Sequence, residues 1–156
     1  MYFKKTIIVL IAIFTGTFAQ AQVKNAKQIL EEAESKIKQI SIDEMKKKID
    51  SGQNFILIDV RTEKEYLAGH IKNAVWIPSG KVKFATQKIT RDPKVEIILY
   101  CRARGQSALS VYALNEIGYE NVLNLDGGFQ KWVNAGNSVF NMHGEIKVVK
   151  FEQKEK

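Results

Sequence analysis

The sequence predicts an α/β fold, a mainly parallel sheet flanked by helices on both faces. Four short, mainly apolar runs lie at 55–60, 74–77, 95–100 and 122–125, and the first of them is rich in β-branched residues. Segments with helical character at 63–68, 107–117 and 129–135 lie between or after them. The chain has 156 residues, of which 45% are apolar, enough for one domain. Strands that alternate with helices in one domain favour a single parallel sheet covered on both sides.

The chain begins with the three-part pattern of a secretory signal peptide over 1–21. Lys4 and Lys5 precede an apolar run at 6–19, and Ala19-Gln20-Ala21 is a small-x-small cleavage site. We expect cleavage after Ala21, a periplasmic or secreted bacterial location, and no stable membrane span afterwards. The alternative is a retained anchor, but a membrane-spanning helix needs about 20 apolar residues.

The mature chain is expected to have three parts. Residues 22–40 are predicted to form an amphipathic lead-in helix, because apolar residues recur there at helical spacing: Ile29, Leu30, Ala33, Ile37 and Ile40. One domain is expected over 41–140, in which Ser41 and Asp43 can cap a helix that ends at Gly52. A charged tail is expected over 141–156.

Chemistry-bearing residues follow two of the predicted strands. Asp59-Val60-Arg61 closes the first strand, and Cys101 directly follows the third. Functional sites of parallel sheets form at the carboxyl ends of the strands. These residues therefore define the expected site. His70 precedes the second strand and is interpreted as structural.

The chain has one cysteine, Cys101, which excludes an intramolecular disulfide and a cysteine zinc cluster. A strand ends at this residue, and a helix follows within a few positions. Backbone N–H groups at such a turn can point into one concavity. Arg102 and Arg104 add positive charge, so we expect the loop to stabilise a thiolate and to hold an anion beside it.

The loop lacks the residues that two other cysteine chemistries require. A tyrosine-phosphatase-like loop needs an arginine six positions after the cysteine, where Ser107 stands. A C-x-x-C redox motif is absent, because Arg104 occupies the second cysteine position. A Cys–His pair with His70 or His143 stays open, as does a plain buried cysteine.

The cysteine loop and the Asp59 segment together resemble the rhodanese-like sulfurtransferase family, in particular its small exported members. The matching positions are Asp59-Val60-Arg61, Glu65-Tyr66, Gly69-His70-Ile71, Ile77-Pro78, the loop from Cys101, Gly118-Tyr119, Asp126-Gly127-Gly128 and Trp132. The resemblance spans about 40–140 and implies that Cys101 is the sulfur-carrying nucleophile. It also implies the substrate-binding residues: Arg102, Ala103, Arg104, Gly105, Gln106, Ser107, Asp59 and Arg61. It implies no cofactor and no metal.

The resemblance implies transfer of sulfane sulfur from a small anionic donor such as thiosulfate, through a Cys101 persulfide, to cyanide or a thiol. The formal charge of +7 favours anionic substrates, and nothing in it indicates nucleic-acid binding. The alternatives are a non-catalytic sulfur carrier or partner-binding module, and a redox-responsive thiol protein. Many family members have Gly at the fourth loop position. Arg104 there is expected to be strained if φ is positive, or the flexible point moves to Gly105.

Overall fold

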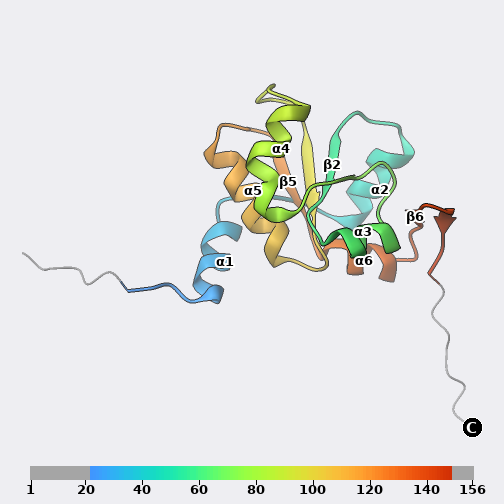
Figure 1. The fold of residues 1–156 in the computed structure, drawn as a ribbon, viewed down its shortest axis with the longest axis horizontal. Coiled ribbons are helices and arrows are strands. Elements are labelled where there is room, and N and C mark those ends of the chain that lie inside the picture. The colour runs from blue at the N-terminus through green and yellow to red at the C-terminus, as the bar shows by residue number, and fades with distance from the viewer. Residues whose placement is uncertain (1–21, 149–156) are drawn as a thin grey trace, which may run out of the picture.

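Five parallel strands form the central sheet, in the order β1-β5-β4-β2-β3 (Figure 1). This computed structural model describes residues 22–148, so the predicted signal peptide lies outside the described residues. The strands are β1 Lys38–Ile40, β2 Ile56–Asp59, β3 Val75–Trp76, β4 Ile97–Tyr100 and β5 Val122–Leu125. All four pairings are parallel, which confirms the predicted sheet.

The described residues contain six α-helices, of which three begin at a capping side chain. The helices are α1 Ala26–Glu34, α2 Ile42–Asp50, α3 Glu63–Ala68, α4 Val82–Ile89, α5 Gly105–Glu116 and α6 Gly128–Asn134, with a short 3-10 helix η1 at Ser79–Lys81. Asn25, Ser41 and Thr62 each form a capping box with the Gln or Glu three positions on. The predicted cap at Ser41 is thereby confirmed.

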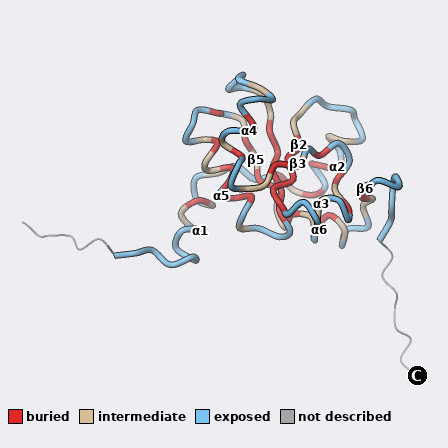
Figure 2. The backbone as a smooth tube through the Cα atoms, viewed as in Figure 1, coloured by how far each residue is buried: buried red, intermediate tan, exposed pale blue. Residues whose placement is uncertain are grey.

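Apolar side chains of the sheet divide into two clusters, one on each face. Leu57, Ile98 and Leu125 face α2 and α6, together with Met45 and Trp132 from those helices. On the other face the strand residues pack with helix α5, as the cluster of Ile58, Ile97, Leu99, Val111 and Leu114 shows. Figure 2 shows this burial concentrated along the strands, with exposed backbone around them. The prediction of helices on both faces is confirmed.

The predicted lead-in helix is too long. Helix α1 ends at Glu34, and residues 38–40 form the edge strand β1, paired with β5. Ile37 packs against the α5 cluster, whereas Ile40 belongs to the opposite one. A spacing of three residues places side chains on one face of a helix but on opposite faces of a strand. The apolar pattern at 37–40 is therefore that of a strand between two cores.

The expected charged tail from 141 is also incorrect in its first part. Strands β6 Val139–Asn141 and β7 Gly144–Ile146 form an antiparallel hairpin. The backbones of His70 and Phe140 exchange two hydrogen bonds, which tie the hairpin to the domain. Residues 149–156 of the expected tail lie outside the described residues. Between residues 22 and 148, no helix has the length and apolar character needed to cross a membrane.

Candidate active site

The cysteine loop and the Asp59 segment lie side by side at the carboxyl edge of the sheet. Strand β2 ends at Asp59 and strand β4 at Tyr100, and these two residues are register partners. Cys101 follows Tyr100, and helix α5 begins at Gly105. The structure thus brings together the two motifs that the sequence singles out.

Cys101 is nearly enclosed, with 3% of its surface exposed. The buried Ser107 hydroxyl lies 3.2 Å from its Sγ and can donate a hydrogen bond to the sulfur. A donor in this position stabilises negative charge on sulfur. His70 is engaged elsewhere, since its ring stacks on Tyr66 at 4.0 Å and its Nδ1 lies 3.0 Å from the Tyr66 carbonyl oxygen. The Cys–His pair that the sequence left open is not formed by His70.

The loop after Cys101 presents a row of backbone donors. Within residues 22–148, the N–H groups of 102–107 donate no hydrogen bond to protein acceptors. Ala103, Gly105 and Gln106 therefore contribute through their backbone, whatever their side chains. Consecutive N–H groups that lead into a helix N-terminus form a site suited to an anion.

The N-terminal turn of helix α6 is hydrogen-bonded to the backbone of this loop. The N–H groups of Phe129 and Gln130 donate to the carbonyl oxygens of Cys101 and Arg102, both at 2.9 Å. Gly128, at φ +56, makes this approach possible, because a Cβ there would lie 2.5 Å from the Cys101 oxygen. The sequence identified Asp126-Gly127-Gly128 as a turn, and the structure adds that it secures the cysteine loop.

The two loop arginines, which the sequence predicts to frame an anion pocket, make different contacts. The Arg104 guanidinium donates to both carboxylate oxygens of Glu34 on α1, at 2.7 and 2.5 Å. Arg102 lines a cleft beside the loop and has no ion-pair partner in the described part of the chain. Sequence reasoning missed Glu34, because a contact across this distance along the chain leaves no local pattern.

The positive φ that would strain a side chain at the fourth loop position does not occur. Arg104 has φ −152, and neither Arg104 nor Gly105 lies in the left-handed region. Arg104 therefore avoids the cost of a positive φ, although its φ of −152 and ψ of −54 lie outside the main allowed regions. The expectation that the flexible point moves to Gly105 is wrong as well.

Asp59 and Arg61 form a buried ion pair below the loop, with 0% and 4% of their surfaces exposed. Arg61 Nε lies 3.0 Å from both Asp59 oxygens, and Nη2 donates to the Gly69 carbonyl at 2.7 Å. Burial opposes the guanidinium charge, but the hydrogen bonds and charge of Asp59 raise the pKa of Arg61 overall. Its guanidinium carbon lies 3.8 Å from the centre of the Phe129 ring. Asp59 thus fixes the position of the Arg61 guanidinium, and of these two side chains Arg61 lines the cleft described next.

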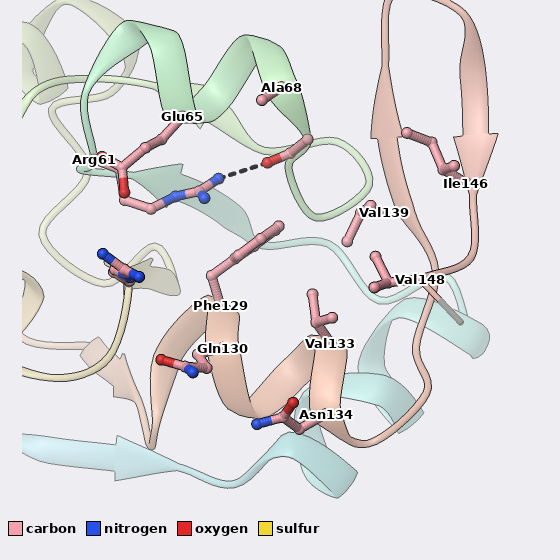
Figure 3. A pocket seen from close by; sticks show the side chains of 12 residues that line it. Arg61, Glu65, Ala68, Phe129, Gln130, Val133, Asn134, Val139, Ile146 and Val148 are labelled. Carbon is pink, nitrogen blue, oxygen red and sulfur yellow. Dashed lines mark hydrogen bonds between the residues drawn. The ribbon is translucent and has the colours of Figure 1, made fainter. Parts of the chain in front are cut away.

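The cleft beside the loop has a volume of about 580 Å³. Figure 3 shows Arg61 and Glu65 at one end and Val139, Ile146 and Val148 at the other, with Phe129 and Val133 between them. Hydrogen bonds from Thr62, opposed by partial burial, lower the pKa of Glu65. Among the described residues, no three His, Cys, Asp or Glu side chains gather as metal ligands would.

These features define an α/β domain whose one cysteine begins a loop lined by backbone N–H groups. The chain belongs to the rhodanese-like domain family, whose sequence model matches residues 41–135. A protein of Allochromatium vinosum named sulfurtransferase is 27% identical over 64% of this chain and 92% of its own length. A Bacillus subtilis protein, YrkF, whose name marks it as a candidate sulfur carrier, is 28% identical over 76% of this chain and 66% of its own length.

A solved structure agrees with this placement. A rhodanese-like domain protein from Staphylococcus aureus matches with a TM-score of 0.56 and 28% identity. The match covers 62% of this chain and 91% of that protein. The hairpin β6–β7 and helix α1, by contrast, lie outside the segment that the family model matches.

Proposed function

We propose that the protein is a sulfurtransferase that carries sulfane sulfur as a persulfide on Cys101. Relatives named as a sulfurtransferase and as a candidate sulfur carrier support sulfur transfer in general. The observation that carries the proposal is a single cysteine whose loop offers unpartnered N–H groups at 102–107. A persulfide anion needs such preorganised donors, for the same physical reason that an oxyanion does.

The proposed donor is thiosulfate. The Cys101 thiolate attacks the outer sulfur, a new S–S bond forms, and sulfite leaves with the electron pair of the broken bond. Arg102 supplies the positive charge that attracts the dianion, while the loop N–H groups and the Ser107 hydroxyl stabilise the persulfide. Arg104 takes no direct part, because Glu34 holds its guanidinium.

The proposed acceptor is cyanide or a thiol, which attacks the outer sulfur of the persulfide and regenerates the thiolate. Two half-reactions through a covalent intermediate give ping-pong kinetics. Neither step requires a cofactor or a metal ion. We also propose a periplasmic or secreted location, supported by the signal-peptide pattern at 1–21, and N-terminal sequencing of the exported protein should give Gln22 first.

The test is thiocyanate production from thiosulfate and cyanide by residues 22–156, with Cys101→Ser as the control. Turnover that disappears in Cys101→Ser supports the proposal. A persulfide that forms once and is then passed only to a protein partner would favour the sulfur carrier, for which YrkF is the precedent by name. Turnover that persists in Cys101→Ser would exclude Cys101 as the nucleophile.

A further inference from the structure

Strand β7 of the hairpin β6–β7 is an open sheet edge. It pairs with β6 on one side, and every residue from 142 to 148 is exposed to solvent. Figure 2 shows most of this hairpin as exposed backbone at the rim of the domain. An open edge presents unpaired N–H and C=O groups, and these can hydrogen-bond the strand of another chain.

The direction of the backbone groups in β7 follows from the contacts of its neighbour. Phe140 of β6 exchanges two hydrogen bonds with His70, at 2.9 and 2.8 Å, so its N–H and C=O point away from β7. Phe140 and Glu145 are register partners. Partners in an antiparallel pair that do not bond each other both direct these groups outward, so those of Glu145 point to the open edge. Backbone direction alternates along a strand, and extending β7 by one residue gives Lys147 the same direction.

The two faces of this edge differ in chemistry. Ile146 and Val148 line the cleft beside the cysteine loop and leave 38% and 52% of their surfaces exposed. Glu145 and Lys147 alternate with them and therefore lie on the opposite face. In the part of the chain between residues 22 and 148, neither of these charged side chains forms an ion pair. The edge thus combines an apolar face with an acid and a base two positions apart.

We propose that two copies of this chain pair through this edge, with their β7 strands antiparallel about a two-fold axis at Ile146. The two hairpins then form one four-stranded sheet. Glu145 of each copy lies opposite Lys147 of the other, and the outward N–H and C=O groups of these two residues form the interchain hydrogen bonds. Such an interface is self-complementary, as two-fold symmetry requires.

The charges select this register. A two-fold axis at Glu145 or at Lys147 would also join outward backbone groups, but it would set like charges directly opposite each other, which is destabilising. The register centred on Ile146 instead forms two pairs of opposite charge. The order acid, apolar, base is its own complement when the strand is reversed, and this favours a second copy of the chain over an unrelated strand as the occupant.

The pairing also covers part of the apolar face. Residues opposite each other in an antiparallel pair lie on the same side of the sheet, so Ile146 contacts its own equivalent in the other copy. Each copy thereby shields part of the apolar wall that the other leaves exposed. A contact of a few residues on each side is smaller than the interfaces of stable dimers, so we expect a weak, concentration-dependent dimer.

Sedimentation equilibrium of residues 22–156 over a concentration series tests the pairing independently of sulfur transfer. We expect a monomer–dimer equilibrium. Glu145→Lys and Lys147→Glu each convert the two attractive charge pairs into repulsive ones, so each should raise the dissociation constant about tenfold or more. Lys88→Glu is the matched control, since Lys88 is an exposed residue of α4. It should change the dissociation constant by less than about twofold.

A mixture of the two charge variants tests the register directly. One variant presents two lysines and the other two glutamates at the paired positions, so together they restore both contacts of opposite charge. We expect the equimolar mixture to dimerise with the affinity of the wild type, which also shows that both variants are folded. A wild type that stays monomeric up to about 1 mM would overturn the inference. A dimer that neither variant weakens, or a mixture no tighter than its components, would overturn it as well.

Discussion

Replacing Gly128 by alanine tests whether helix α6 holds the cysteine loop in place. Gly128 has φ +56, and a Cβ there would lie 2.5 Å from the Cys101 oxygen and 2.9 Å from the Ala103 oxygen. Both oxygens belong to the backbone and cannot rotate away. Gly136 is the matched control, since its φ is +78 but no atom lies within 4 Å of the corresponding Cβ.

Both substitutions place an alanine in the left-handed region, and Gly128→Ala also creates a steric clash with the loop. Alanine in the left-handed region costs about 1–2 kcal/mol at either position. Gly128→Ala must also push α6 from the loop, which weakens the hydrogen bonds from Phe129 to Cys101 and from Gln130 to Arg102. Each bond contributes about 0.5–1.5 kcal/mol. We therefore expect Gly128→Ala to lower the free energy of unfolding by about 2–5 kcal/mol and Gly136→Ala by about 1–2 kcal/mol.

Urea unfolding followed by tryptophan fluorescence measures the stability difference. Thiocyanate formation, assayed without urea where both variants are folded, measures the effect on the site. Gly128→Ala should lower kcat because it displaces the loop, and Gly136→Ala should leave kcat at the wild-type value. Equal losses of stability together with an unchanged kcat in Gly128→Ala would refute the proposed support of the loop by α6.

Three further predictions concern charges near the loop. Asp59→Asn leaves the buried Arg61 guanidinium without a counter-charge, so the free energy of unfolding measured in urea should fall by about 3–5 kcal/mol. A fall below about 1 kcal/mol would contradict a stabilising role of the Asp59–Arg61 ion pair. Arg102→Ala should raise the KM for thiosulfate about tenfold, the equivalent of about 1.4 kcal/mol, whereas Arg104→Ala should change it by less than about twofold; steady-state kinetics that show equal effects would contradict the assignment. The Thr62 hydroxyl holds the pKa of Glu65 below its ordinary value of 4.5. The hydrogen bond between Thr62 and ionised Glu65 therefore stabilises the fold above pH 4.5, and this stabilisation is lost as the pH falls through the lowered pKa. The difference in unfolding free energy between wild type and Thr62→Val should accordingly shrink in acid, and a difference independent of pH would contradict it.

Local patterns predict the centre of this fold well. The run before Asp126 predicts β5 with its observed bounds, Val122–Leu125, because three of its four residues are apolar, as a buried parallel strand requires. The position of Cys101 at a strand end followed from the same reasoning. The run at 37–40 was misassigned, because helix and strand patterns cannot be told apart over so few residues.

Long-range contacts account for what the sequence did not reveal. Glu34 and Arg104 are separated by 70 positions, so the ion pair that engages the Arg104 guanidinium has no local signature. The hairpin β6–β7 is equally hidden, since its place beside the cleft depends on the backbone bonds between His70 and Phe140. Helix α4, Val82–Ile89, was not predicted at all.

The most direct test of the central claim is intact-mass analysis of residues 22–156 after incubation with thiosulfate. We predict a mass gain of one sulfur atom, located by peptide mapping on Cys101, and its disappearance when cyanide is added. Cys101→Ser should show no gain. An unchanged mass in the wild type, or a bound sulfur that cyanide does not remove, would contradict persulfide-based sulfur transfer by this protein.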